Sequence, residues 1–326
     1  MEVKINYLVI GAVVAAAIAL ILGFNQTISQ TASALSLPKN SIFVAAGDWG
    51  CKSSTAGTVS TAVKLNPNLV LALGDLSYQG NTDCWENIIK PIFSKTRIVI
   101  GNHDVVDPEM TANYTRDFNL RNQYYSFNYN NVHVVVLSSE IAYGTSSSQY
   151  AFVKADLSQA ASNSSINWII AAVHKPIYTS SSNQPAPADL RATFSPLFDK
   201  YGVDLVLAGH NHNYQRTYPL AFNANNPGSP IIKSYSKTCY YDPSGPIYLI
   251  SGAGGQSHAY LGSQKSFVIR QFSDKYGVSK IDITNIQNSS GQMGTIMSLV
   301  FYQNGKLGTP IDPFKITKGA AATNIC

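Results

Sequence analysis

Six short apolar runs constrain the fold of this chain more than any other feature of its sequence. The runs are SIFVAAGDWG, NLVLALGDLSY, RIVIGNHD, WIIAAVHKP, DLVLAGHNH and PIYLISGAGG, and each passes from apolar residues to glycine or polar residues. Runs of this length, bounded by turn residues and separated by helix-length segments, predict buried strands in α/β units. Helices are predicted in the intervening segments 55–65, 84–93, 149–159 and 189–201.

Three further segments predict antiparallel strands. The stretch YYSFNYNNVHVVVLSS predicts a hairpin with Asn130 and Asn131 in its turn. Near the C-terminus, VSKIDITNIQ and TIMSLVFYQNGKL alternate apolar and polar residues, a pattern typical of half-buried strands. The mixture predicts an α/β fold in which two mixed sheets pack together, with helices on the outside.

The N-terminal segment predicts export of the rest of the chain. Residues 7–24 form an uncharged apolar run, and Lys4 precedes it. This run is close to the shortest that crosses the ~30 Å hydrocarbon core, yet it is long for the apolar part of a signal peptide. Residues 1–34 are therefore predicted to be either a cleaved signal peptide or a membrane anchor. Residues 35–40 would be a linker and 41–326 the folded domain, which is secreted or anchored.

The charge of the chain narrows its partners. The formal net charge is +5, and lysine and arginine form no run. Nucleic acid is therefore not predicted as a partner, whereas a small anionic substrate is. Charged residues make up only 13% of the chain, which suits a secreted or cell-surface protein. The oligomeric state is left open.

Four cysteines are present, at positions 51, 84, 239 and 326. No Cys-x-x-Cys pair occurs, so a zinc knuckle is not predicted. In an exported chain an even number permits two disulfides, which can be paired in three ways. We favour Cys51 with Cys84, which leaves Cys239 to hold the C-terminal Cys326.

Polar residues gather where the predicted strands end. Five of the six runs carry Asp, Asn or His at that end, namely Asp48, Asp75, Asn102, His103, Asp104, His174, His210 and His212. Each alone would be a turn former, a helix cap or a core histidine. Taken together, that interpretation would have to hold five separate times. Because ligands of α/β sheets lie beyond the carboxyl ends of strands, the residues are predicted to form one site.

The ligand types in this set indicate transition metals. Carboxylate, imidazole and amide groups suit Mn, Fe or Zn, and there are too many for one tetrahedral zinc. Asp75 is the residue that could bridge two ions. Two ions about 3.5–4 Å apart form the clamp used for in-line displacement at phosphorus.

The motifs GDWG, GDLSY, GNHD, AAVHKP and GHNH follow the order found in calcineurin-like metallophosphoesterases. Tyr78, three residues after Asp75, makes the chain resemble the purple acid phosphatases among them, of the small single-domain type. The segments HKPIY, GHNHNYQRTYPL, SSSQYAFVKADL and SGAGG support the resemblance, which extends over residues 42–260. It implies a four-layer αββα sandwich of two mixed β-sheets flanked by helices.

The resemblance also implies a role for each site residue. Fe(III) would be held by Asp48, Asp75, Tyr78 and His212. A divalent ion (Fe, Zn or Mn) would share Asp75 and be held by Asn102, His174 and His210. His103 would contact the substrate phosphate or protonate the leaving oxygen. The activity implied is hydrolysis of a small phosphate monoester by a metal-bound hydroxide. The pKa of a phenol is ~10, so a free tyrosine stays protonated in acid. Ligation by Tyr78 at acidic pH therefore requires an ion as Lewis-acidic as Fe(III).

One departure and two rival functions accompany this interpretation. Relatives usually carry one or two further histidines between His174 and Pro196, where this chain has none. Protonation of the leaving group would then fall to His103 or to solvent. The alternative enzyme is a Mn- or Zn-dependent phosphodiesterase or nucleotidase of the same superfamily, and Tyr78 discriminates against it. A surface protein that binds phosphate or metal without turnover is the third hypothesis, which the complete ligand set argues against.

Overall fold

The computed structural model describes Leu37 and residues 39–326, with the exception of Ser182. The predicted signal peptide or anchor, with its apolar run 7–24, lies outside the described residues, as do residues 35, 36 and 38 of the linker. Within the described part of the chain, no helix combines the length and apolar character needed to cross a bilayer.

Two mixed sheets form the centre of the fold. Within the described residues, the first sheet has seven strands in the order β10-β15-β14-β13-β1-β2-β3. Their bounds are β1 Ser41–Ala46, β2 Leu69–Ala72, β3 Thr96–Ile98, β10 Cys239–Tyr241, β13 Gly277–Gln287, β14 Met293–Gln303 and β15 Ile311–Lys318. Strands β1, β2 and β3 run parallel to one another, and β13 joins β1 in the antiparallel sense. The parallel strands therefore end at one common edge.

The second sheet follows the same plan, in the order β12-β8-β11-β7-β6-β5-β4, with β9 paired to β8. Its strands are β4 Tyr125–Tyr129, β5 Val132–Val136, β6 Trp168–Val173, β7 Leu205–Ala208, β8 Tyr214–Ala221, β9 Ile231–Ile232, β11 Ile247–Ser251 and β12 Val268–Phe272. Strands β5, β6, β7 and β11 are parallel. Their carboxyl ends also share one edge, so each sheet presents a row of strand ends.

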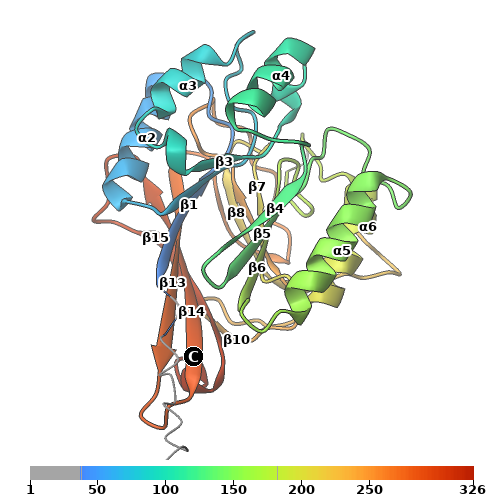
Figure 1. The fold of residues 1–326 in the computed structure, drawn as a ribbon, viewed down its shortest axis with the longest axis vertical. Coiled ribbons are helices and arrows are strands. Elements are labelled where there is room, and N and C mark those ends of the chain that lie inside the picture. The colour runs from blue at the N-terminus through green and yellow to red at the C-terminus, as the bar shows by residue number, and fades with distance from the viewer. Residues whose placement is uncertain (1–36, 38, 182) are drawn as a thin grey trace, which may run out of the picture. The chain divides into compact units, whose positions relative to one another are not determined.

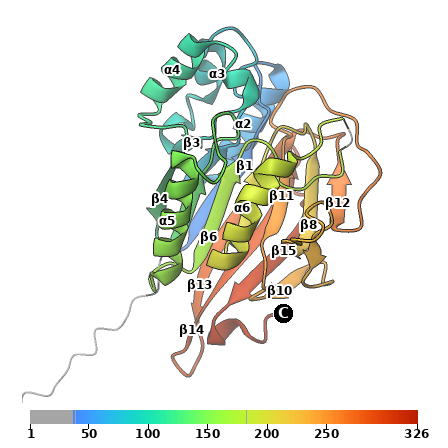
Figure 2. The ribbon, with the colours of Figure 1, turned by 90° about the vertical axis from the view of Figure 1, so that its right-hand side faces the viewer.

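Helices cover the outer faces of both sheets (Figures 1 and 2). Their bounds are α2 Ser53–Leu65, α3 Asp83–Ile89, α4 Pro108–Asp117, α5 Ser148–Ser162 and α6 Ala188–Tyr201, with single 3₁₀ turns η1 Phe93–Lys95, η2 Asn102–Asp104 and η3 Ala320–Ala322. Leu190, Phe194 and Phe198 recur at helical spacing on α6 and are buried against the second sheet. Val59 and Ala62 of α2 do the same against the first sheet.

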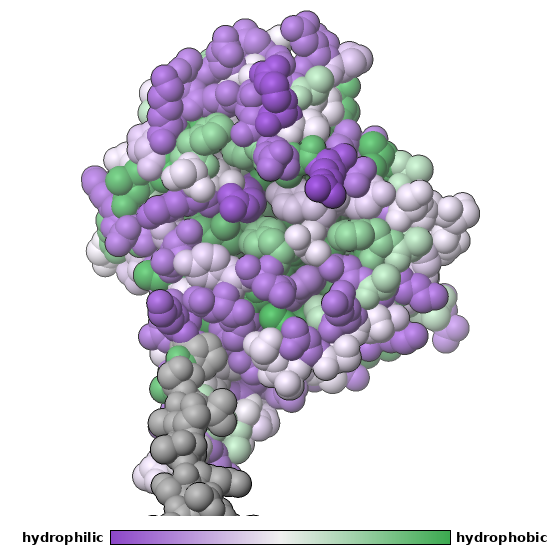
Figure 3. Space-filling view, viewed as in Figure 1, coloured by the Kyte–Doolittle hydropathy of each residue, from purple (hydrophilic) through white to green (hydrophobic). Residues whose placement is uncertain are grey.

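The main core lies between the two sheets. Phe43 and Leu71 from the first sheet pack into one cluster with Val134, Trp168 and Leu207 from the second. This arrangement confirms the predicted α/β fold of two mixed sheets flanked by helices, an αββα sandwich. On the outside, polar side chains separate small apolar areas on the face shown in Figure 3.

Most of the predicted elements are confirmed. The six apolar runs are β1, β2, β3, β6, β7 and β11, and the predicted hairpin is β4–β5, with Asn130 in a left-handed turn at φ 53°. Both favoured disulfides, Cys51–Cys84 and Cys239–Cys326, are present. The sequence reading missed α4, although Asp107 caps its first turn and Pro108 begins it. It also missed the strands β8, β12 and β15 and the short strands β9 and β10.

Candidate metal centre

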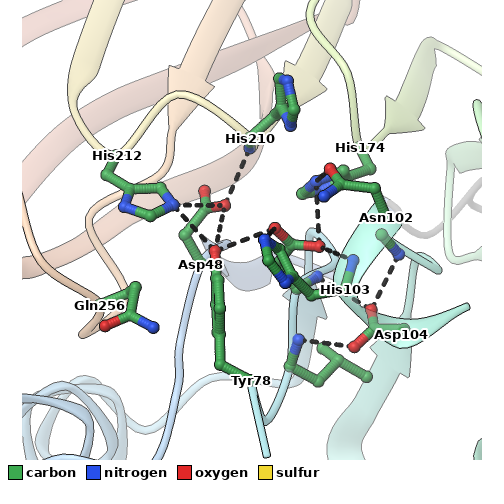
Figure 4. A network of polar contacts seen from close by, with 12 residues as sticks. Asp48, Tyr78, Asn102, His103, Asp104, His174, His210, His212 and Gln256 are labelled. Carbon is green, nitrogen blue, oxygen red and sulfur yellow. Dashed lines mark hydrogen bonds and ion pairs between the residues drawn. The ribbon is translucent and has the colours of Figure 1, made fainter. Parts of the chain in front are cut away.

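The rows of strand ends bring the predicted site residues together (Figure 4). Asp48, Asp75 and Asn102 follow β1, β2 and β3, while His174 follows β6 and His210 follows β7. Glycines let the two sheets meet here, since a Cβ on Gly47 would lie 3.1 Å from the Cα of Gly209.

One half of the centre surrounds the hydroxyl group of Tyr78. Its oxygen lies 2.9 Å from Asp75 Oδ2, 3.2 Å from Asp48 Oδ1 and 2.8 Å from His212 Nε2. On the far side of its ring, His212 Nδ1 donates to the carbonyl of Ser257 at 2.6 Å. Because a carbonyl only accepts, this bond leaves the lone pair of Nε2 facing the centre.

The other half consists of Asp75, His174, His210 and Asn102. His174 Nδ1 donates to the carbonyl of Leu73 at 2.8 Å, so Nε2 faces inward and can offer its lone pair to an ion once it is deprotonated. That Nε2 lies 3.2 Å from Asp75 Oδ1 and 3.2 Å from Asn102 Oδ1. The rings of His174 and His210 are nearly perpendicular, at 79°. Asp75 is the residue common to both halves.

The donor atoms fit two cations that share Asp75. Three acceptor atoms surround the single hydroxyl proton of Tyr78, and two oxygens face Nε2 of His174. Two buried atoms, Asp48 Oδ2 and His210 Nδ1, have no hydrogen-bond partner among the described residues. Ligand atoms of Asp48, Asp75 and His212 lie within 4.8 Å of one another, as do those of Asp75, His174 and His210. Buried acceptors without donors are costly, and a cation in each set would satisfy them.

The pKa values of the site residues in the metal-free protein are also shifted in ways that favour a positive charge at the centre. Burial raises the pKa of Asp48 and of the Tyr78 phenol, and the neighbouring carboxylates raise that of Tyr78 further. Burial also acts to raise the pKa of Asp75, but His174 outweighs it and holds that pKa well below its usual range. Burial acts to lower the pKa of His174, whereas Asp75 and Asp48 raise it to about 10. Without an ion, a proton on His174 is therefore the cation of the centre.

The backbone is held in left-handed conformations at four of these residues. The φ values are 59° at Asp48, 52° at Asp75, 58° at Tyr78 and 67° at His210. Such values are uncommon for side chains as large as tyrosine and histidine, and they cluster at functional sites. The surrounding structure must therefore hold the backbone of these loops in conformations that are unfavourable by themselves.

Asp104 is one of the groups that hold these loops, a role that the sequence reading did not assign to it. Its Oδ2 accepts the backbone N–H groups of Asp75 at 2.9 Å and Gly101 at 2.8 Å, and its Oδ1 accepts that of Leu76 at 2.9 Å. Burial, together with nearby Asp75, raises the pKa of this carboxyl to about 7. The available signal was the acidic residue that closes the motif GNHD.

His103 lies at the open side of the centre. Its side chain is 47% exposed, and its Nε2 is 4.0 Å from Asp75 Oδ2. Its backbone N–H donates to Asp75 Oδ1 at 2.8 Å, and its ring lies against that of Tyr78 with the centroids 4.4 Å apart. The imidazole is therefore free to contact a molecule bound over the centre.

The remaining histidines lie elsewhere. His133 is buried and bonded to Asn128 and Asp156, and His258 stacks on Tyr276. Between His210 and His212, the Asn211 side chain donates to the carbonyl of Gln184. The structure thus gathers Asp48, Asp75, Tyr78, Asn102, His103, His174, His210 and His212. Their roles as metal ligands, and that of His103, stay predictions.

Comparison with known proteins agrees with the fold and the site. The αββα sandwich, with acids and histidines at the carboxyl ends of its strands, places the chain among the metallophosphoesterases. A family model described as calcineurin-like phosphoesterase matches residues 41–214, and the chain belongs to this family.

Relatives within the family are named purple acid phosphatases. Purple acid phosphatase 23 of Arabidopsis thaliana is 28% identical over 252 residues, 64% of this chain and 51% of the relative. Purple acid phosphatase 18 of the same plant is 31% identical over 232 residues, 65% and 49% of the two chains. The chain spans about half the length of these curated relatives. A purple acid phosphatase from yellow lupin (Lupinus luteus) seeds has the same fold, with a TM-score of 0.72, 21% identity and coverage of 86% and 54%.

Proposed function

We propose that the chain is a purple acid phosphatase-like enzyme that hydrolyses small phosphate monoesters. The observation that carries the proposal is the pair of ligand sets joined at Asp75, with the Tyr78 hydroxyl inside one of them. Asp48, Asp75, Tyr78 and His212 would hold Fe(III). Asp75, Asn102, His174 and His210 would hold a divalent ion, Fe, Zn or Mn. When bound, such a pair of ions supplies Lewis acidity that activates water and offsets phosphoryl charge.

The residues of the chain orient the reaction around that centre. Tyr78 and the carboxylates define where the more positive ion belongs, because three anionic groups converge there once the phenol loses its proton. His103 would donate a proton to the leaving oxygen or a hydrogen bond to the phosphoryl group. Its exposed imidazole, held in place by the Tyr78 ring and by its own backbone bond to Asp75, is suited to both tasks.

The proposal is tested by turnover of p-nitrophenyl phosphate together with metal analysis of the purified domain. We expect His210→Ala to lower kcat/KM by at least ~100-fold, since loss of residues that merely orient ligands already costs 10–100-fold. His258→Ala, which removes a histidine outside the centre, should leave activity unchanged. Equal activity in wild type and His210→Ala would sink the proposal.

Tyr78→Phe separates the two enzyme classes. If Fe(III) is bound by the phenolate, the wild-type protein is coloured and Tyr78→Phe loses its visible band. A colourless wild type that is active with Mn or Zn and cleaves phosphodiesters or nucleotides would instead support the alternative enzyme.

We also propose that the domain acts outside the cytoplasm, either secreted or anchored through residues 7–24. The apolar N-terminal run and two disulfides support this location, because disulfides persist in oxidising compartments. When intact cells that express the full chain are treated with protease, an anchored domain should be digested at the cell surface. A secreted domain should be detected in the medium. Full protection inside the cytoplasm would contradict the proposal.

A further inference from the structure

Gln256 is a polar residue of the centre that belongs to neither ligand set. It follows β11, and its backbone N–H donates to the carbonyl of Asp48 at 2.8 Å. Figure 4 shows its side chain beside Tyr78, on the side opposite His103. The two residues therefore flank the Tyr78 ring.

The hydrogen bonds of the chain set the direction of the Gln256 amide. Its Oε1 accepts the backbone N–H of Ser257 at 3.0 Å and the Ser257 hydroxyl at 3.4 Å. Because the N–H of Ser257 is a donor, the atom facing it must be the amide oxygen. The Nε2 group then points the other way. A Cβ on Gly50 would lie 3.6 Å from this Nε2 and 3.7 Å from Tyr78 Cδ2, so the amide nitrogen and the Tyr78 ring both lie next to Gly50.

This amide nitrogen has no hydrogen-bond partner among the described residues, although its segment is firmly held. The carbonyl of Ser257 accepts His212 Nδ1 at 2.6 Å, and its hydroxyl accepts Lys52 Nζ at 3.2 Å. Gln256 itself is half-buried. A fixed donor beside a centre that would be positively charged once its ions are bound is pre-organised for an anion.

We propose that Gln256 binds the substrate, with its Nε2 donating a hydrogen bond to a phosphoryl oxygen opposite His103. The inference rests on the proposed phosphatase function and adds a binding residue to it. It also provides a neutral donor in a chain that has no histidine between His174 and Pro196. The ionised oxygens of a phosphoryl group accept hydrogen bonds, so a fixed N–H contributes affinity without adding charge to the centre.

The variants Gln256→Ala and Gln256→Glu test the hydrogen bond. Alanine removes the donor, and glutamate keeps the size and the oxygen that accepts from Ser257 while replacing the donor by an acceptor. We expect inorganic phosphate to bind about 10-fold more weakly to Gln256→Ala and about 100-fold more weakly to Gln256→Glu, the range for hydrogen bonds to charged groups. Gln292→Glu makes the same charge change in the exposed β13–β14 turn and should leave binding unchanged.

Binding of phosphate is measured by calorimetry on the metal-loaded domain, and its inhibition constant by competition with p-nitrophenyl phosphate. Weakened phosphate binding at unchanged metal content supports the inference. Phosphate affinities within twofold of wild type in both Gln256 variants would overturn it, as would loss of bound metal in both. A wild type that binds phosphate without hydrolysing any ester contradicts the proposed function alone, because calorimetry still decides the role of Gln256.

Discussion

Two clusters of buried charged groups in this fold differ in whether the chain itself provides their counter-ions. The first, the inter-sheet cluster, consists of Arg216, Asp312, Tyr214 and Tyr240. Arg216 forms two bonds of 2.6 Å to the carboxylate of Asp312, and the Tyr214 hydroxyl donates to the same carboxylate at 2.9 Å. The guanidinium also lies over the Phe314 ring at 4.3 Å. This cluster joins β8 to β15 and supplies its own counter-ion.

The second cluster, the candidate metal centre, has no such counter-ion. Its carboxylates have no arginine or lysine bonded to them among the described residues, and Asp48 Oδ2 and His210 Nδ1 are buried without partners. Both clusters contain left-handed backbone, at Asp312 in one and at four residues in the other, so strain does not separate them. The two clusters differ in their charge balance. The inter-sheet cluster is complete within the described residues, whereas the candidate metal centre leaves buried ligand atoms without a partner there.

The largest effect is expected from a substitution that breaks the inter-sheet cluster. Asp312→Ala leaves the Arg216 guanidinium buried without its carboxylate, which should lower the free energy of unfolding by about 3–5 kcal/mol. Denaturant titration should give this loss both with and without metal. Asp282→Ala, which removes the partner of Lys280 in a more exposed pair, is the control and should cost no more than about 1 kcal/mol. A loss that vanishes in metal-free protein would contradict the comparison.

The next effect concerns the residue shared by both ligand sets. Asp75→Asn should reduce kcat/KM by more than ~100-fold, because it acts on both ions at once. Ions that bind only the folded state raise its stability, so adding metal should raise the melting temperature of wild type but not of Asp75→Asn. Asp282→Asn should behave as wild type in both measurements. A metal-dependent rise of equal size in Asp75→Asn would show that the centre does not hold the ions.

Sequence patterns predicted the fold where each element carries its own local signal. The parallel strands were recognised because each apolar run passes directly into glycine, acid or histidine. Strands β8 and β12 lack such a signal, since they pair with strands that are distant in the chain, whereas β15 was missed although it pairs with neighbouring β14. Phe272 of β12, for example, pairs with Tyr214 of β8. Helix α4 was missed although Asp107 and Pro108 give it an ordinary start.

The same division applies to the site. The residues that reach the centre all lie in short motifs, whose order could be compared with a known family. The motifs did not reveal the roles of the supporting residues, because these roles are hydrogen bonds to backbone atoms of other loops, although Asp104 itself closes the motif GNHD. Asp104 holds the N–H of Asp75, and Gln256 contacts the carbonyl of Asp48. Nor does any pattern in the sequence pair Arg216 with Asp312.

Asp104 sharpens the comparison, because here a buried carboxylate of the centre is satisfied by the chain. Asp104→Asn keeps the shape, but one of its two atoms becomes an N–H₂ group that faces a backbone N–H. We expect metal affinity to fall by about 10- to 100-fold, as for other groups that orient ligands. Asp107→Asn, three residues away, keeps a good helix cap and should leave metal affinity unchanged. Unaltered metal affinity in Asp104→Asn would limit Asp104 to a structural role.

The smallest expected effect is a pH dependence that only the metal centre should show. In the metal-free protein, burial acts to lower the pKa of His174, but Asp75 and Asp48 raise it to about 10. This pKa lies above the ordinary value of about 6.5, so the stabilisation by His174 is fully present below about pH 6.5 and is lost as the pH rises through 10. A divalent ion binds only the neutral imidazole, and it must therefore displace that proton.

The apparent affinity for Zn²⁺ should consequently rise by up to about tenfold per pH unit between pH 6.5 and 8.5. Competition with a chelator of known affinity measures it, and calorimetry in two buffers of different ionisation enthalpy counts the protons released. His258→Ala should show the same slope as wild type, since His258 lies outside both ligand sets. A flat profile without proton release would show that no proton on His174 substitutes for the ion in the metal-free protein.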